Sequence, residues 1–371
     1  IYLYLRFIVH LTARRWLKIL YWLPTFLLST GLLYLVYFSN NAFAERHTQD
    51  IGWFSIFFFL FTAPKLLLFL CTVIGIPFHK WLRWPRTPFI CTGLTLAVVS
   101  IVMIIYGSFI GRTQFDVKEV TYSSSKLPSS FDGYRIVQLS DIHIGSWQGN
   151  ASAIQNLVNL VNEQHPDLIA FTGDLVNHRA IELNDFQHIL AGLKAKDGVY
   201  SILGNHDYGP YFRWKNKQEQ DDNLSDLQQR QAAMGWKLLN NSHTILIQGN
   251  DSIALIGVEN EGEPPFSQYA DLPKAMQGTE GMFQILLSHN PTHWRREVLP
   301  ESDIDLMLAG HTHAMQLKLG NYSPSSYIYP EWSGMYLEGT RGLYVNVGIG
   351  YVGLPFRFGA WPEITVLTLR R

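Results

Sequence analysis

The sequence predicts an α/β domain that follows a region of apolar transmembrane helices, and three observations lead to this. Long apolar runs fill residues 1–111. Beyond them, short apolar runs alternate with helical patterns, as in a parallel sheet covered by helices. Five of the short runs end at a cluster of His, Asp or Asn. We therefore place two domains, a helical membrane region at 1–111 and an α/β domain at 112–371.

The net charge and the positions of the cysteines exclude some classes of protein and of site. The chain has 371 residues and a formal net charge of −1, which gives no indication of nucleic-acid binding because nucleic-acid binders concentrate positive charge. Both cysteines, Cys71 and Cys91, lie in the apolar first third. The second domain therefore has neither a disulfide nor a thiolate ligand.

Three apolar runs in the first domain are long enough to cross a bilayer, which takes about 20 residues. They are approximately Ile19–Phe38, Trp53–Pro77 and Pro88–Ile110. Lys65 lies in the middle of the second run. Three explanations are open for a charge there: its side chain extends to the membrane surface, it faces a partner on another helix, or the helix is broken at this point. Residues 1–13 are apolar but too short to span, and we expect them to be the end of a further, truncated transmembrane helix rather than a signal peptide.

Charged residues in the connectors predict an orientation. Two connectors are basic, the one before the first run and the one between the second and third, whereas the loop 39–51 is mixed. The residues concerned are Arg14, Arg15 and Lys18, then Lys80, Arg83 and Arg86, and in the loop Glu45, Arg46 and Asp50. The positive-inside rule places both basic connectors in the cytoplasm, so the α/β domain is expected outside it. Arg112 and Lys118, just after the third run, weaken this expectation.

The α/β domain carries a polar cluster directly after each of five apolar runs. The runs are residues 136–139, 168–171, 199–203, 285–287 and 305–309. The clusters are Asp141-Ile142-His143, Gly173-Asp174, Gly204-Asn205-His206-Asp207, Ser288-His289-Asn290 and Gly310-His311-Thr312-His313. Ligands of α/β sheets bind at the carboxyl ends of the strands, so we expect the five clusters to meet.

The residue types in these clusters predict a metal site. The candidate ligands are Asp141, His143, Asp174, Asn205, His289, His311 and His313. Imidazole, carboxylate and amide groups suit Mn, Zn, Fe or Co. Seven are too many for one four-coordinate zinc but suit two ions roughly 3.5–4 Å apart that share a carboxylate. Such a pair activates a water and clamps the oxygens of an in-line displacement, usually on a phosphate ester.

His206 and Asp207 are the candidate catalytic residues. His206 follows the candidate ligand Asn205 and could protonate a leaving alkoxide, while Asp207 could orient it. Taken singly, several clusters have an ordinary explanation, since Gly-Asp is common turn chemistry and a lone histidine such as His289 is more often a core or loop residue. The whole set, in this order at strand ends, favours the metal site.

The five clusters resemble the calcineurin-like metallophosphoesterase superfamily, over residues 112–371. The tail at 343–350, followed by the sequence Leu354-Pro355-Phe356-Arg357-Phe358-Gly359, resembles its membrane-linked bacterial branch, typified by the YkuE and YaeI phosphoesterases. The resemblance implies a four-layer α/β/β/α sandwich in an integral protein of a bacterial inner membrane. It also implies that His206 is the acid or stabilises the transition state.

The resemblance further implies which residues hold which ion. It assigns one metal to Asp141, His143, Asp174 and His313, and the other to Asp174, Asn205, His289 and His311, with Asp174 bridging. Two positions depart from the family. Asn177 stands where many relatives have a second Asp, and Ala314-Met315-Gln316 stands where many of this branch have Gly-Gly-Gln. The second departure is expected to reshape the pocket wall.

Other segments of the α/β domain bear on the site. We predict helices at 152–164 and 181–193 and a hairpin across 245–256, while the polar stretch 214–235 is a cap helix or a mobile lid, with helix favoured over 224–234. Aromatic residues flank the clusters: Trp147, Tyr208, Tyr211, Phe212, Trp214, Tyr327, Tyr329, Trp332 and Tyr336. They are either surface rings packed on the sandwich or an apolar rim that admits a lipid phosphate.

Three functions remain open on the sequence. The leading one is a membrane-anchored di-metal phosphoesterase that hydrolyses phosphate ester or pyrophosphate bonds on a phospholipid, a lipid-linked pyrophosphate or a soluble ester. The second is a nucleotide–lipid pyrophosphatase of the UDP-2,3-diacylglucosamine type, which needs a cytoplasmic site. The third, of another class, is a non-catalytic metal-bound sensor or interaction domain. The intact ligand set and His206 favour an enzyme.

Overall fold

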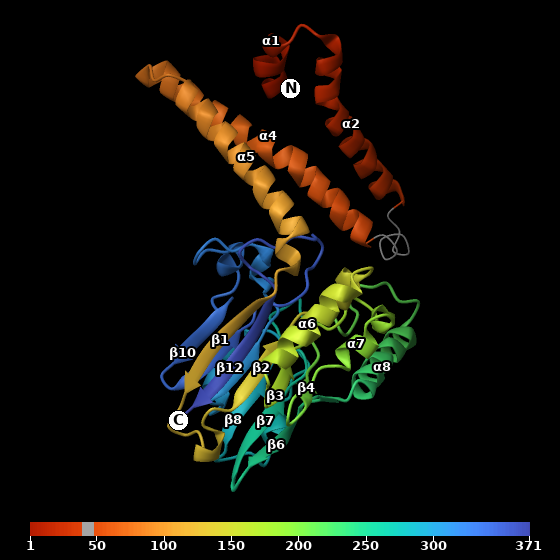
Figure 1. Ribbon diagram of the computed structural model, residues 1–371, viewed down its shortest axis with the longest axis vertical. Helices are drawn as coiled ribbons and strands as arrows, with labels where there is room; N and C mark the ends of the chain where they lie inside the picture. The colour runs from red at the N-terminus through yellow and green to blue at the C-terminus, as the bar shows by residue number, and fades with distance from the viewer. Residues whose placement is uncertain (39–47) are drawn as a thin grey trace. The chain divides into compact units, whose positions relative to one another are not determined.

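The computed structural model describes residues 1–38 and 48–371, and the chain divides into two compact units (Figure 1). One unit comprises Ile1–Gly111 together with Gly353–Phe356. The other comprises Arg112–Val352 and Arg357–Arg371. The main division thus falls between residues 111 and 112, and a short segment of the tail groups with the helical unit.

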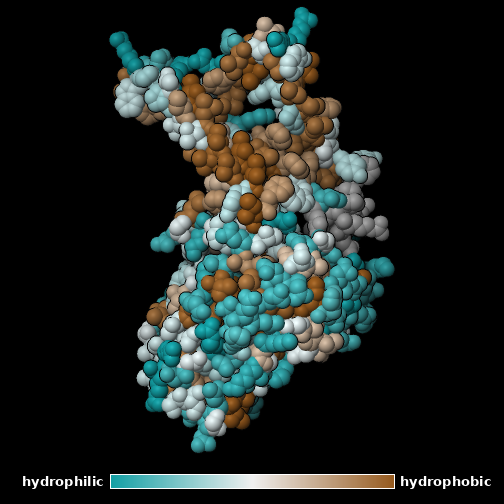
Figure 2. All heavy atoms as spheres, viewed as in Figure 1, coloured by the Kyte–Doolittle hydropathy of each residue, from teal (hydrophilic) through white to brown (hydrophobic). Residues whose placement is uncertain are grey.

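Three long helices dominate the first unit. They are α2 (Arg15–Phe38), α4 (Thr48–Leu82) and α5 (Thr87–Phe109), preceded by the short η1 (Tyr4–Ile8) and α1 (Val9–Leu11). Each long helix contains a stretch long and apolar enough to cross a membrane, and Figure 2 shows apolar side chains covering much of their surface. The three predicted apolar runs therefore form three helices that could span a membrane. Of the predicted loop 39–51, Glu45 and Arg46 lie outside the described residues, whereas Asp50 belongs to the first turn of α4.

The charge within the second span has a partner on a neighbouring helix. Helix α4 continues through Pro64 and Lys65 without a break. The Lys65 ammonium lies 5.0 Å from the centre of the Tyr21 ring on α2, a distance at which a cation is attracted to an aromatic face. Of the three explanations for this lysine, the structure supports the helix partner.

Two mixed sheets of six strands form the second unit. The first has the order β1-β12-β2-β3-β4-β5 and the second β10-β11-β9-β8-β7-β6. The first contains β1 (Asp116–Ser123), β12 (Glu363–Arg370), β2 (Arg135–Leu139), β3 (Leu168–Phe171), β4 (Val199–Ser201) and β5 (Trp236–Leu238). The second contains β10 (Gly334–Glu338), β11 (Arg341–Val345), β9 (Leu306–Ala309), β8 (Phe283–Leu287), β7 (Asp251–Gly257) and β6 (Ser242–Gln248).

Alternating side chains along the central strands build three apolar cores, and these define four layers. Ile136 of β2 packs between the sheets, while its neighbour Val137 packs outward against α6 (Ala151–Glu163). In the second sheet Leu287 faces the inner core, while Leu286 faces the other way, toward Trp294. Figure 1 shows α6 across the face of the first sheet. The expected α/β/β/α sandwich is confirmed.

Short helices complete the outer layers and the loops. On the side of the first sheet lie η5 (Ala180–Leu183), α7 (Gln187–Leu190) and α8 (Lys217–Ala233), and on the side of the second lie α9 (Leu272–Met276), η6 (Trp294–Val298) and α10 (Leu299–Glu301). The remaining short turns are η2 (Gly111–Thr113), η3 (Ser129–Phe131), η4 (Ile144–Trp147), η7 (His313–Gln316) and η8 (Pro324–Tyr327).

Two local predictions need correction. The helix expected over 181–193 is instead two short pieces, η5 and α7, because Asn184 and Asp185 interrupt it and such residues favour turns over helix interiors. The polar stretch 214–235 is helical from Lys217, well before residue 224, because Asn216 caps it by accepting the backbone N–H of Glu219. The hairpin over 245–256 is confirmed as the antiparallel pair β6–β7.

Candidate metal centre

All seven predicted ligands lie just beyond the carboxyl ends of parallel strands. In the first sheet, β2, β3 and β4 are adjacent and parallel. They lead into Asp141 and His143, Asp174, and Asn205, respectively. In the second sheet, β8 and β9 are adjacent and parallel and lead into His289 and into His311 and His313. The sandwich therefore brings the polar loops of both sheets to one place.

Five of the seven candidate ligands adopt left-handed backbone angles. The φ values are 53° at Asp141, 45° at His143, 58° at Asp174, 72° at His311 and 50° at His313. Residues with a Cβ atom rarely adopt this region, and such strain concentrates at functional sites. The backbone is thus bent sharply at each loop so that the side chains turn inward.

Two glycines allow the loops to approach each other closely. A methyl group at Gly310 would collide with the Ser140 hydroxyl and the Asp141 carboxylate, and one at Gly204 would collide with the Asp174 carboxylate. No other residue fits at either position without displacing a candidate ligand. This is why glycine directly precedes His311 and Asn205.

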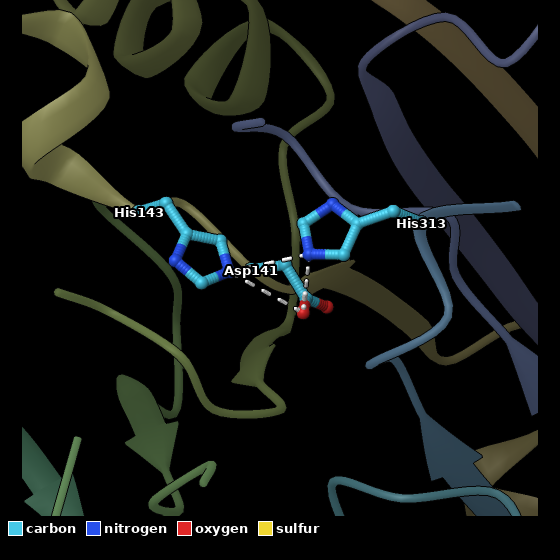
Figure 3. A group of neighbouring side chains, drawn as sticks. All are labelled: Asp141, His143 and His313. Carbon is cyan, nitrogen blue, oxygen red and sulfur yellow. Dashed lines mark hydrogen bonds and ion pairs between the residues drawn. The ribbon is translucent and has the colours of Figure 1, made fainter. Parts of the chain in front are cut away.

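The first group of candidate ligands consists of Asp141, His143 and His313 (Figure 3). The Nε2 atoms of the two histidines lie 3.2 Å apart. Asp141 Oδ1 lies 3.1 Å from Nε2 of His313 and 3.9 Å from Nε2 of His143. The other carboxylate oxygen, Oδ2, accepts hydrogen bonds from the Ser140 hydroxyl and the His311 backbone N–H. Asp141 is thereby fixed with Oδ1 turned toward the imidazoles.

Asp174 lies between this group and a second one. Its Oδ2 atom is 3.5 Å from Nε2 of His143 and 3.2 Å from Nε2 of His289. Its Oδ1 atom accepts the backbone N–H of His206, which leaves Oδ2 facing both groups. The carboxylate therefore has the position expected of a bridging ligand.

The second group consists of His289 and His311 together with Asp174, and Asn205 is the further ligand predicted for it. Nε2 of His289 lies 3.2 Å from Nδ1 of His311. The outer nitrogen of His289, Nδ1, lies 2.8 Å from the Thr172 carbonyl oxygen, which holds the proton on that side and leaves Nε2 free to bind a metal. Asn205 donates its amide N–H to the Tyr211 hydroxyl, so its Oδ1 atom is turned away from that contact.

The buried charges shift the pKa values of these groups in opposite directions. Burial lowers the pKa of His311 to about 3, and repulsion from His289 adds to the effect. Burial also lowers the pKa of His289, but the Asp174 carboxylate outweighs it and raises that pKa to about 9. Burial disfavours the Asp174 carboxylate, yet His289 and His206 hold its pKa below the usual value. The aspartate is ionised and His311 neutral, the forms that bind metals, whereas His289 must release a proton from Nε2 when a metal binds there.

The free atoms of this cluster fit a divalent metal. Asp141 Oδ1 and Asn205 Oδ1 are buried without a hydrogen-bond partner among the described residues. An unsatisfied buried oxygen is costly in a folded protein, and a bound cation would satisfy both of these oxygens. Oxygen and nitrogen donors of this kind suit borderline to hard divalent ions.

His206 and Asp207 have separate roles. Nδ1 of His206 lies 2.8 Å from the Asn177 carbonyl oxygen, and its ring lies 4.7 Å from that of His143. Asp207 was expected to orient His206, but its carboxylate instead accepts four backbone N–H groups, from Asp174, Leu175, Val176 and Gly204. The Asn177 carbonyl takes the orienting position, and Asp207 holds the loop that carries Asp174.

A buried arginine at the site was not anticipated as a functional residue. The Arg357 guanidinium is buried and donates to the carbonyls of Gly350, Ala360 and Val347. Its Nη2 atom lies 3.0 Å from Nδ1 of His313. Burial lowers the pKa of Arg357 to about 10, which keeps it charged at neutral pH. The sequence signal was present, because Arg357 belongs to the motif at 354–359.

The segment after His313 is strained where relatives were expected to have glycine. Ala314, Met315 and Gln316 have φ values of 48°, 46° and 60°. Glycine adopts these angles without penalty, whereas residues with a Cβ atom do not. The departure from Gly-Gly-Gln therefore leaves the backbone turn in place and adds the Met315 side chain, which is partly exposed.

The aromatic residues that flank the clusters do not form one surface. Trp147 is fully buried and stacks on Phe115 in the core, so it is not part of an exposed rim. By contrast, Tyr211 packs on His206 and Tyr329 on His311, with ring centres 4.5 and 5.6 Å apart. Phe266, which the sequence did not single out, also packs edge-on against His311 at 4.7 Å.

Two mixed sheets that converge on a buried His, Asp and Asn cluster define a metallophosphoesterase. Residues 134–315 match the family described as calcineurin-like phosphoesterase, and residues 1–112 match a family described as the transmembrane domain of a probable calcineurin-like phosphoesterase. The chain belongs to the calcineurin-like metallophosphoesterases, a family of phosphoester hydrolases.

Several curated metallophosphoesterases match most of the chain. An uncharacterized metallophosphoesterase of Bacillus subtilis, YkuE, is 31% identical over 71% of this chain and 89% of its own length. A transmembrane protein with a metallophosphoesterase domain from Danio rerio is 32% identical over 74% of this chain. The match covers 62% of the Danio rerio protein, less than two thirds of its length. The bovine protein of the same description is 29% identical over 82% of this chain and 71% of its own.

Proposed function

We propose that this protein is a membrane-anchored di-metal phosphoesterase that hydrolyses phosphate ester or pyrophosphate bonds. The observation that carries the proposal is the position of Asp174 Oδ2, 3.5 Å from His143 Nε2 and 3.2 Å from His289 Nε2. One carboxylate oxygen that faces two separate groups of nitrogen ligands suits a bridged pair of ions.

The residues divide into two ligand sets. Asp141, His143, His313 and Asp174 would hold one ion, and Asp174, His289, His311 and Asn205 the other. Bound divalent ions supply Lewis acidity toward phosphoryl oxygens and lower the pKa of water. The chain itself orients the ligands, through the Thr172 carbonyl at His289 and the Ser140 hydroxyl at Asp141.

His206 is the proton donor in this proposal. Its Nδ1–H is held by the Asn177 carbonyl, so the opposite nitrogen, Nε2, is the one available to a leaving group. As the imidazolium cation it gives a proton to the departing alkoxide. The ring is half-buried beside His143 and Tyr211, which fixes its plane.

The membrane helices support a substrate at or near a membrane surface. Helix α5 ends at Phe109 and strand β1 begins at Asp116, so a short connection ties the α/β unit to a membrane span. We propose a lipid phosphoester as the substrate and a bacterial plasma membrane as the location, which the Bacillus subtilis relative supports. The basic connector between α4 and α5 favours an extracytoplasmic active site.

The test is an activity screen of the full chain in detergent, loaded separately with Mn²⁺, Zn²⁺, Fe²⁺ or Co²⁺. Phosphomonoesters, phosphodiesters and phospholipids are the substrates, and a chelator-treated sample is the control. The proposal expects metal-dependent hydrolysis of at least one class, with lipids preferred. Full metal occupancy without hydrolysis of any class would favour a metal-bound sensor instead.

A further inference from the structure

Two tyrosines contact the outer atoms of the second group of ligands. The Tyr329 hydroxyl lies 3.1 Å from Nε2 of His311, and the Tyr211 hydroxyl lies 3.0 Å from Nδ2 of Asn205. Tyr329 follows η8, whereas Tyr211 lies between β4 and α8. Two loops from different sheets therefore place a phenol at the same ligand group.

The direction of these two hydrogen bonds follows from the ligands. Nδ1 of His311 faces Nε2 of His289 at 3.2 Å, so Nδ1 is the inner nitrogen and must carry a lone pair to bind a metal. The outer Nε2 then carries the proton and donates it to Tyr329. In the same way, Asn205 can offer its oxygen to a metal only if its NH₂ group faces Tyr211.

Each phenol oxygen thus accepts a hydrogen bond and retains its own proton to donate. A phenol with the usual pKa of about 10 is protonated at neutral pH, and Tyr211 lies near enough to Tyr329 to interact with it electrostatically. Among the described residues, no protein atom accepts a hydrogen bond from the hydroxyl of Tyr211 or Tyr329. Both side chains are at least partly exposed, so a solute can reach them.

We propose that the hydroxyls of Tyr211 and Tyr329 donate to the non-bridging oxygens of the substrate's phosphoryl group. This inference rests on the proposed phosphoesterase function and assigns two neutral donors to the anion. They lie on the side of Asn205 and His311, opposite the Asp141 group. The same donors hold the product, so inorganic phosphate binds to them as well.

Phenylalanine variants isolate the hydroxyl, because they keep the ring and its packing. Tyr211→Phe, Tyr329→Phe and the double variant are compared with Tyr327→Phe, whose ring is 80% exposed. The full chain in detergent is saturated with Mn²⁺, its metal content is measured, and inorganic phosphate binding is followed by calorimetry. Each single variant is expected to bind phosphate about tenfold more weakly at unchanged metal content, since a hydrogen bond to a charged group is lost.

The alternative is that the phenols only orient Asn205 and His311. In that case the variants would need more Mn²⁺ for saturation, but once saturated they would bind phosphate as the wild type does, and this result would overturn the inference. Failure of the metal-loaded wild type to bind phosphate or hydrolyse any ester would instead overturn the proposed function and, with it, the role of the phenols.

Discussion

Nδ1 of His206 lies 2.8 Å from the carbonyl oxygen of Asn177, and this contact sets the direction in which the imidazole can act. A backbone carbonyl accepts but cannot donate, so Nδ1 carries a proton. Any proton that His206 gives to a leaving group would therefore come from Nε2. Because the partner is a backbone atom, this contact does not depend on the side chain at position 177, which is buried and donates to the Ser146 hydroxyl instead.

Replacement of His206 should separate catalysis from metal binding. His206→Ala is expected to retain the metals and lose activity by about 10²–10⁴-fold on a substrate with a poor leaving group. A nitrophenyl ester should show a smaller loss, because its leaving group needs little protonation. His188→Ala, at an exposed histidine, is the control. Equal losses on both substrates would remove the proton-donor role.

Replacement of Asp207 should affect stability before it affects chemistry. Its carboxylate accepts four backbone N–H groups, and an amide can accept on one side only. Asp207→Asn is expected to lower the free energy of unfolding by at least about 2 kcal/mol, since it leaves two buried N–H groups without an acceptor and each costs roughly 1–3 kcal/mol. Thermal unfolding measures this loss of stability, and Asp185→Asn, at an exposed position, is the control. An unchanged melting temperature with reduced turnover would return Asp207 to the catalytic machinery.

The pH dependence of stability should include a contribution from His178. Burial, with repulsion from His206 and Arg179, lowers its pKa from 6.5 to about 4. Between those values the unfolded chain binds a proton that the folded chain does not, so stability falls as the pH drops through this window, by up to about 1.4 kcal/mol per pH unit. Above pH 6.5 there is no such loss.

Melting curves at several pH values can isolate that contribution. His178→Asn should lose less stability than the wild type between pH 6.5 and 4, whereas His188→Asn, at an exposed position, should behave as the wild type. The role of His178 would be disproved if both variants followed the wild-type curve.

The parts of the site that were predictable depend on residue type and strand order. Parallel strands bring their carboxyl ends together, so Asp141, Asp174 and His289 could be grouped without coordinates. The direction in which each side chain points was harder to predict from the sequence. His206 and Asp207 are adjacent in sequence but point to different partners, and no pattern in the sequence distinguishes them. Tyr211 and Tyr329 were noted for their rings, whereas the role of their hydroxyls depends on loops that only the fold brings together.

Membrane topology can be tested with reporter fusions. Lys80, Arg83 and Arg86 lie at or beside the connector between α4 and α5, so this connector is expected in the cytoplasm. An alkaline-phosphatase fusion at residue 371 should be active and a green-fluorescent fusion dark. Fusions at Trp84, within the connector, should show the reverse. Fluorescence at residue 371 would contradict the orientation and favour a nucleotide–lipid pyrophosphatase, whose substrate is cytoplasmic.

The most direct test of the di-metal site is the metal content of the folded, metal-loaded chain. Wild type is expected to carry two ions per chain, and Asp174→Ala should lose both, because the carboxylate that faces His143 and His289 is removed. Asp185→Ala should keep two. A wild-type chain that is folded and saturated yet holds one ion or none would contradict the account.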